Sequence, residues 1–106
     1  MNEARINLLK NYIDEEPKEP FNHYALACEY LNGKEEEAMR LFKKLLNDFP
    51  DYLATYYQAA QLLQEFEQVE EALEVYTRGI ALAKRQNNAK TLNELKVAKQ
   101  NLEFEM

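Results

Sequence analysis

The chain has 106 residues, of which 46% are hydrophobic and 30% charged, with a formal net charge of −6. This length suits one domain, and the composition is that of a folded protein rather than a disordered chain. The acidic balance argues against binding to a phosphate backbone, and the single Cys cannot form an internal disulfide. No apolar run resembles a membrane span or a secretory signal, so we expect a cytoplasmic protein.

Six helices are predicted and no strand. Apolar residues recur at three- and four-residue steps in six successive segments, which is the period of amphipathic helices. Breakers such as Pro17, Gly33 and Pro50 separate the segments. We expect Asp51 to cap the fourth helix, and Gly33 to adopt a positive φ after the second. The expected helices cover residues 3–15, 21–32, 34–48, 52–66, 68–86 and 89–104.

The chain also resembles itself at a fixed period. Residues 36–42 and 70–76 share two Glu, an Ala and a final aromatic residue at an offset of 34. Upstream, residues 24–27 overlie residues 57–60 at an offset of 33. A helical hairpin repeated about every 34 residues is a specific signature of a repeat protein. One hairpin cannot bury its own apolar stripe, so neighbouring hairpins are expected to stack.

These residues resemble the tetratricopeptide repeat family, in particular its small two-repeat bacterial members. The first repeat carries motif positions at Leu26, Ala27, Tyr30, Ala38, Phe42, Leu45 and Pro50, and the second at Tyr56, Ala59, Ala60, Leu63, Ala72, Tyr76 and Gly79. Lys84 stands where the closing Pro is expected, which predicts a fifth helix that continues to about Gln86.

The resemblance implies an all-α fold, a right-handed α-solenoid of about six antiparallel helices. It also implies a single domain over residues 1–106. Its expected parts are an N-terminal half repeat at 1–18, repeats at 20–51 and 52–86, and a capping helix at 88–106.

In this family the first helix of each repeat lines a concave groove. The matching positions are Phe21, Tyr24, Cys28 and Leu31 in the first repeat and Tyr57, Gln61 and Gln64 in the second. Lys96 and Lys99 of the last helix are the basic candidates beside the groove. Tyrosines offer flat apolar area and a hydroxyl, which suits binding of a peptide or a helix. The alternative that Tyr24 and Tyr57 only pack against neighbouring helices stays open.

The resemblance implies a non-catalytic scaffold that binds a protein or peptide partner in this groove. An alternative is a structural homo-oligomer or fixed subunit that assembles through exposed terminal helices. A clamp for acidic chaperone tails is not expected, because Tyr24, Cys28 and Gln58 replace its Lys and Asn residues. Nucleic-acid binding is not expected either, because no basic stripe interleaves with the aromatic residues.

No catalytic, metal or cofactor site is expected. His23 and Cys28 are the only His and Cys, and two residues five apart on one helix supply neither four zinc ligands nor a nucleophile with its base. We expect instead a half-exposed His23 and a buried Cys28. The carboxylate clusters lie at helix ends, where they are solvated, and both Gly residues are isolated, so no phosphate-binding loop is present.

Overall fold

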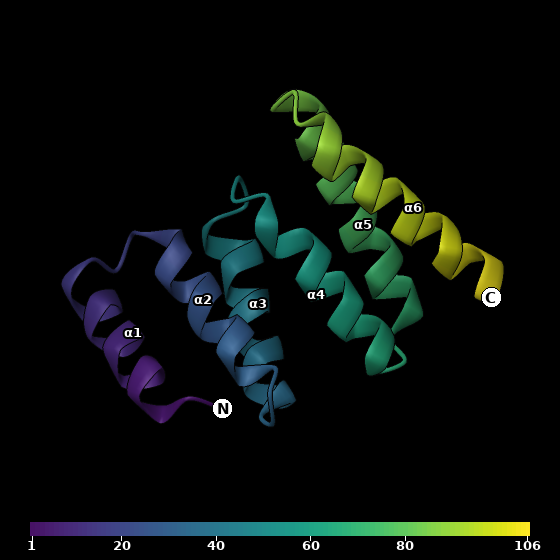
Figure 1. The fold of residues 1–106 in the computed structure, drawn as a ribbon. Coiled ribbons are helices and arrows are strands. Elements are labelled where there is room, and N and C mark those ends of the chain that lie inside the picture. The colour runs from purple at the N-terminus through teal and green to yellow at the C-terminus, as the bar shows by residue number, and fades with distance from the viewer. The chain divides into compact units, whose positions relative to one another are not determined.

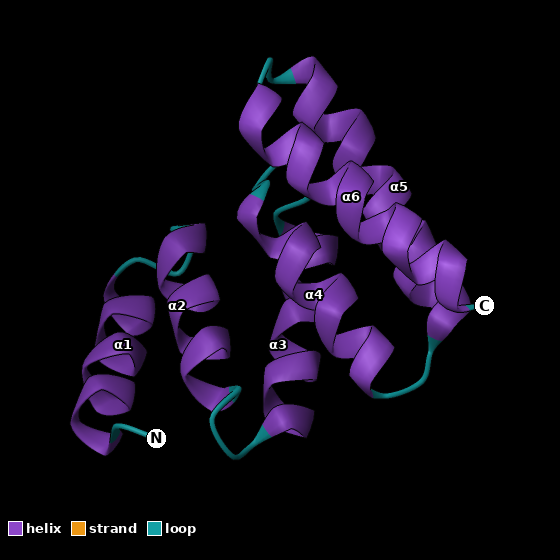
Figure 2. Ribbon diagram, turned by 45° about the vertical axis from the view of Figure 1, so that its right-hand side comes forward, coloured by secondary structure: helices purple, strands orange, loops and turns teal.

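The computed structural model describes residues 1–106, and all of its regular structure is helical (Figure 2). The helices are α1 Glu3–Glu15, α2 Pro20–Tyr30, α3 Glu35–Asp48, α4 Ala54–Glu65, α5 Val69–Arg85 and α6 Ala89–Glu105. They confirm the six predicted helices, each end falling within two residues of its expected position. None of the six is both long and apolar enough to cross a bilayer. The chain divides into two compact units, residues 1–55 and 56–106, with the boundary in the first turn of α4.

In the first unit α2 packs against both α1 and α3, and the three helices alternate in direction (Figure 1). Ala27 and Ala38 have no exposed surface. Their small side chains allow the two helices to cross closely, and a larger side chain at either position would push the helices apart. Phe42 and Leu45 of α3 fill the adjacent space and are also buried. Burial of such a side chain contributes about 1.5–3 kcal/mol, so this hairpin is held mainly by its apolar stripe.

The start of α1 is attached to α2 by a polar cluster around Glu29. The Asn2 backbone N–H donates to Glu29 Oε1 at 3.1 Å, and Arg5 Nε lies 3.3 Å from Glu29 Oε2. The Asn2 side chain also caps α1 by accepting from the Arg5 N–H at 3.0 Å. Ile6 and Leu9 are the buried residues of this helix. α1 is therefore held by two apolar side chains and one shared carboxylate.

In the second unit α4 packs on α5, and α5 lies antiparallel beside α6 (Figure 1). The three helices meet at Gly79. A Cβ atom there would lie 2.8 Å from the Tyr56 Cβ and 3.1 Å from Leu95 Cδ1. The absence of a side chain at Gly79 is thus what allows this approach. The small residues with no exposed surface in this unit are Ala59, Ala60, Ala72 and Ala83.

Both α4 and α5 end in a residue of left-handed conformation. Glu67 has φ 62° and Asn87 has φ 56°. In each case the next N–H reaches back five residues to a carbonyl of the last turn, which is the Schellman arrangement. The bonds run from Gln68 N to Leu63 O and from Asn88 N to Ala83 O, each 2.9 Å long.

The predicted helix ends have mixed outcomes. Gly33 has φ 132°, which confirms its positive φ, and α5 reaches Arg85, close to the expected Gln86. α4 begins at Ala54, two residues later than expected, so Asp51 lies three residues before the first residue of the helix. After α3 the chain makes a separate turn, closed by the Tyr52 N–H and the Phe49 carbonyl at 3.0 Å.

Candidate functional site

Three predicted groove residues share one face of α4. Tyr57, Gln61 and Gln64 are spaced four and three apart, so their side chains lie above one another on the helix. All three are half-buried. These three side chains, called here the α4 wall, are therefore partly packed against the protein and partly exposed to solvent.

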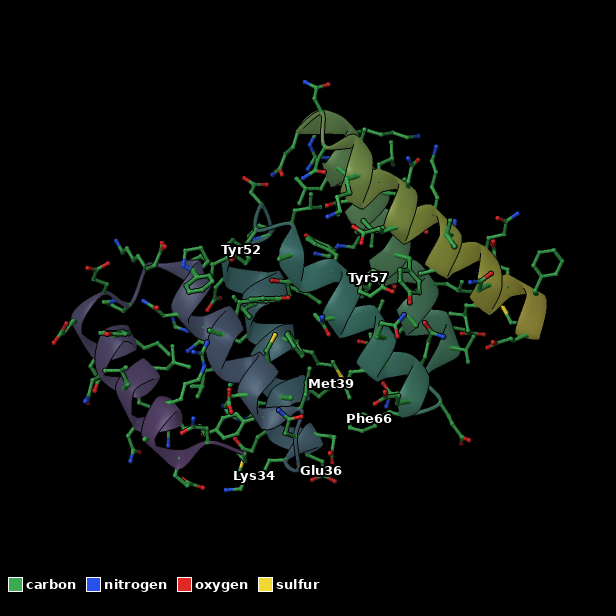
Figure 3. All side chains as sticks on the ribbon, in the orientation of Figure 1. Lys34, Glu36, Met39, Tyr52, Tyr57 and Phe66 are labelled. Atoms are coloured by element: carbon green, nitrogen blue, oxygen red, sulfur yellow. The ribbon has the colours of Figure 1, made fainter.

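A face of α6 lies opposite this wall, and the two border an open pocket of about 520 Å³. Figure 3 shows the Tyr57 side chain on the side of α4 that is turned toward α6. Val97 is 56% exposed and supplies apolar surface at the opening. The α6 residues of the pocket are Asn93, Glu94, Val97, Ala98, Asn101 and Glu105.

The two glutamines are held in position by a buried tyrosine of α5. Gln61 Nε2 donates to Tyr76 Oη at 3.1 Å, and the Tyr76 hydroxyl donates in turn to Gln64 Oε1. The Tyr76 residue itself has no exposed surface. Burial raises the pKa of Tyr76, against the lowering effect of the Gln61 hydrogen bond, so the hydroxyl stays protonated and keeps its donor role.

This network leaves defined groups free on each glutamine. Gln61 uses one N–H and keeps its carbonyl oxygen, whereas Gln64 uses its carbonyl oxygen and keeps its amide N–H groups. The α4 wall thus presents an acceptor and a donor in fixed order along one helix face.

The charge in the pocket is negative. Its lining includes the carboxylates of Glu94 and Glu105 and no Lys or Arg. Lys96 and Lys99, predicted beside the groove, lie outside the lining residues. At about 100° per residue, both point more than about 120° away from the middle of the α6 face that lines the pocket.

The predicted groove residues of the first repeat lie on α2, in the other unit. Phe21 is 51% exposed, and Leu31 is half-buried just after the helix. The Tyr24 ring packs against Phe42 and Tyr52, with ring centroids 6.3 and 5.7 Å away. Figure 3 labels Tyr52, whose pKa is raised by its own burial and by the nearby Glu19 and Cys28. Tyr24 is therefore tied into the packing of its own hairpin.

His23 and Cys28 do not form a reactive pair. His23 Nε2 donates to the Pro17 carbonyl at 2.8 Å, and its ring lies 5.4 Å from that of Phe49. The expectation of a half-exposed His23 is wrong: the residue is 7% exposed, because it packs against the segment that leads into α2.

Cys28 also differs from its prediction, since it is half-buried rather than buried. Partial burial raises the pKa of its thiol, although a hydrogen bond with Tyr24 acts in the opposite direction. A raised pKa keeps the thiol protonated and poorly nucleophilic. No group of three or more His, Cys, Asp or Glu side chains is placed to hold a metal ion.

Sequence reasoning missed the α6 side of the pocket. The leucines of this helix indicate a capping helix, and the sequence pattern points only to Lys96 and Lys99 of this helix as groove residues. A signal was nevertheless present, because Asn93, Val97, Asn101 and Glu105 follow one another at four-residue steps. This mostly polar stripe lies beside the leucine stripe of α6 and could have indicated a second face of the helix that lines the groove.

Comparison with known proteins agrees with this architecture. A tetratricopeptide repeat family model matches residues 29–95, more than half of the chain. A solution NMR structure of a tetratricopeptide repeat domain protein from Salinibacter ruber is 36% identical, with a TM-score of 0.78, and the match covers 83% of this chain and 90% of that one. A crystal structure of such a protein from Salinibacter ruber is also 36% identical, with a TM-score of 0.78, covering 80% and 96% of the two chains.

A more distant structure, the MamA RS-1 ArsTM double mutant, is 17% identical with a TM-score of 0.54. The match covers 94% of this chain and 84% of that one, and it bears on the fold alone. No curated protein matches the chain.

The predicted fold class, an all-α α-solenoid of tetratricopeptide type, is confirmed by the six helices and these similarities. Domains of this type bind protein partners and are generally non-catalytic. The 34-residue hairpin period, the buried small residues and the family match lead to one conclusion: the chain belongs to the tetratricopeptide repeat family.

Proposed function

We propose that the pocket between α4 and α6 binds a peptide segment of another protein, and that the chain acts as a non-catalytic scaffold. The observation that carries the proposal is the pair Gln61 and Gln64, fixed by the Tyr76 hydroxyl beside the exposed Val97. Side chains already ordered avoid a cost of about 0.5–1.5 kcal/mol each on binding. The pocket volume of about 520 Å³ falls in the range usual for ligand sites.

The remaining predicted residues enter the proposal separately. A further contact surface is proposed at Phe21, Tyr24 and Cys28 on α2 and at Leu31 just after it. Phe21 is the residue to substitute first because it is 51% exposed. Lys96 and Lys99 face away from the pocket and are proposed as charge contacts to a part of the partner that lies outside it. The variants Lys96→Gln and Lys99→Gln test this contact. Cytoplasmic localisation is also part of the proposal, and fractionation of the source cells tests it.

Affinity capture with a matched pair of tyrosine variants tests the pocket. The full chain, Tyr57→Ala and Tyr12→Ala are immobilised and exposed to extract of the source cells. Tyr12 is 43% exposed on α1, so its loss removes the same side chain from another surface. We expect Tyr57→Ala to lose the partners that the full chain and Tyr12→Ala retain, and binding to the recovered partner is then measured by calorimetry. Partners kept by Tyr57→Ala would rule out the pocket.

Self-association through terminal helices is the alternative that specific residues favour. Leu8 and Tyr12 are four apart on α1 and are 47% and 43% exposed, and Phe104 on α6 is 82% exposed. Exposed apolar residues on one face are typical of contact surfaces. Sedimentation at several concentrations distinguishes the two: a tight dimer that Leu8→Lys dissociates supports assembly, and a monomer at all concentrations opposes it.

A further inference from the structure

We propose that the occupant of the α4–α6 pocket is an extended, basic segment with two Lys or Arg side chains about five positions apart. This inference rests on the proposed function and adds the chemistry of the partner. Four amide side chains, two separated carboxylates and a short apolar stretch between them carry it.

The amides favour an extended chain over a helix. Gln61 offers an acceptor and Gln64 a donor, both held by Tyr76, and Asn93 and Asn101 on α6 each offer both kinds of group. An extended peptide leaves its backbone N–H and C=O groups free to pair with such side chains, whereas a helix satisfies its own. Backbone pairing on both walls therefore selects an extended occupant.

The carboxylates favour a basic occupant. Glu94 and Glu105 line the pocket, no cation does, and neither carboxylate forms an ion pair within the chain. Lys90, four residues before Glu94, does not form one with it. Both carboxylates are exposed, so an acidic peptide would be repelled and a neutral one would gain no ion pair, whereas a basic peptide gains the modest attraction of exposed charge pairs.

The spacing follows from helix and strand geometry. Glu94 and Glu105 are eleven residues apart on α6, a rise of about 16 Å. An extended chain covers this length in about five residues. Val97 and Ala98 lie between the two carboxylates, with Tyr57 on the opposite wall, so small or apolar side chains fit between the basic ones.

A selection from random peptides tests the inference, whatever the sequence of the natural partner. An acetylated and amidated random octapeptide library is passed over the immobilised full chain, and retained peptides are sequenced by mass spectrometry. We expect Lys and Arg to be enriched about threefold or more, most often in pairs four to six positions apart. The enrichment is expected to weaken in 0.5 M NaCl, because exposed charge pairs are screened by salt.

Five variants locate the effect: the double Glu94→Gln/Glu105→Gln change, each of its two single changes, Glu103→Gln and Tyr57→Ala. Glu94→Gln/Glu105→Gln removes the two carboxylates of the pocket, and Glu103→Gln removes an exposed carboxylate of α6 outside it. Tyr57→Ala reports on the pocket itself. For one selected peptide, each of Glu94→Gln and Glu105→Gln is expected to raise the dissociation constant by about two- to fivefold, which is the effect of losing one exposed ion pair. Glu103→Gln is expected to leave it unchanged.

Each contrary outcome overturns a distinct claim. Peptides retained in a Tyr57-dependent way with no bias toward Lys or Arg overturn the basic occupant and leave the proposed function standing. A bias that persists in the double Glu→Gln variant overturns the assignment to Glu94 and Glu105. Absence of any Tyr57-dependent retention overturns the pocket as a site for extended peptides, and the proposed function with it.

Discussion

The hairpin of α2 and α3 and the hairpin of α4 and α5 repeat the same core with a different polar surface. The second helix carries a fully buried ring in both, Phe42 in the first and Tyr76 in the second. Where the aligned first helix has Cys28 and Leu31, its counterpart has Gln61 and Gln64. The hydroxyl and the two amides occur together, because a buried hydroxyl requires partners. The difference shows that the core repeat sets the fold, while one hydroxyl and two amides mark the pocket.

The hairpins also differ where a third helix approaches. Leu45 of α3 aligns with Gly79 of α5 at the offset of 34, and Leu45 is buried while Gly79 has no side chain to bury. In the second hairpin, Tyr56 and Leu95 lie in the space that a side chain at residue 79 would occupy. The two hairpins therefore keep the 34-residue period, but the side-chain packing differs between the aligned positions 45 and 79.

The largest effect is expected when the second hairpin is given the residue of the first. Gly79→Leu should lower the free energy of unfolding by about 3 kcal/mol, because its Cβ alone would lie 2.8 Å from the Tyr56 Cβ. Urea denaturation measures it. Ala81→Leu, on an exposed position of α5, is the control and should change stability by less than about 0.5 kcal/mol. Equal stability of Gly79→Leu and the parent would mean that the three helices are less tightly packed.

Exchange of the two rings tests the link between hydroxyl and amides. Phe42→Tyr should destabilise by about 1–3 kcal/mol, because the aligned Cys28 and Leu31 offer no amide to a buried hydroxyl. Tyr76→Phe should cost about 1 kcal/mol, since the half-buried glutamines can turn to water. Thermal melts compare the two. Addition of Leu31→Gln to Phe42→Tyr should recover part of the lost stability. A double variant no more stable than Phe42→Tyr would show that the buried hydroxyl does not depend on an amide at this position.

The turns of the two hairpins provide a smaller contrast. The first uses Gly33 at a positive φ, whereas the second places Glu67 at φ 62°. Glu67→Gly should therefore stabilise the chain by about 0.5–1 kcal/mol, because a side chain is strained in this region. Asn87→Gly should change stability less, since Asn tolerates the conformation better. The midpoints of urea denaturation measure the two changes in stability. A stability gain for Asn87→Gly without one for Glu67→Gly would contradict the prediction.

The smallest expected effect is the pH dependence of stability that comes from Cys28. The second hairpin has no such group, because the residue aligned with Cys28 is Gln61. Burial raises the pKa of the Cys28 thiol above its usual 9.0 in the folded chain. The contribution of this thiol to stability is thus fully present below pH 9 and is lost as pH rises through the raised value. The rate of alkylation by iodoacetamide, followed against pH, should rise at higher pH in the folded chain than in urea. Coincident profiles would show that the thiol is not desolvated.

The helices and the register of the repeat are well predicted from the sequence, because both depend on local signals. Alanines at the crossings, a 34-residue period and apolar residues at helical spacing are visible in the chain itself. Helical spacing likewise predicts that Tyr57, Gln61 and Gln64 share one face. These features do not depend on which helix lies opposite.

Features that depend on a distant partner are harder to predict. His23 is buried because its ring reaches the Pro17 carbonyl, a contact that no periodicity encodes. The role of Tyr76 in orienting Gln61 and Gln64 joins residues of two helices, and motif position alone identifies Tyr76 only as a core ring. The acidic lining from α6 depends on which of its faces meets α4, and the leucine stripe leaves that choice open.

The carboxylate shared by Asn2 and Arg5 has a consequence for how the molecule opens. Glu29 holds the first turn of α1 through one backbone bond and one ion pair, and the Arg5 side chain is 52% exposed. Such an attachment weakens with ionic strength, while the interior of the α2–α3 pair does not. Amide hydrogens of α1 should consequently exchange with solvent before those of α3, and added salt should widen the gap by local detachment of this helix.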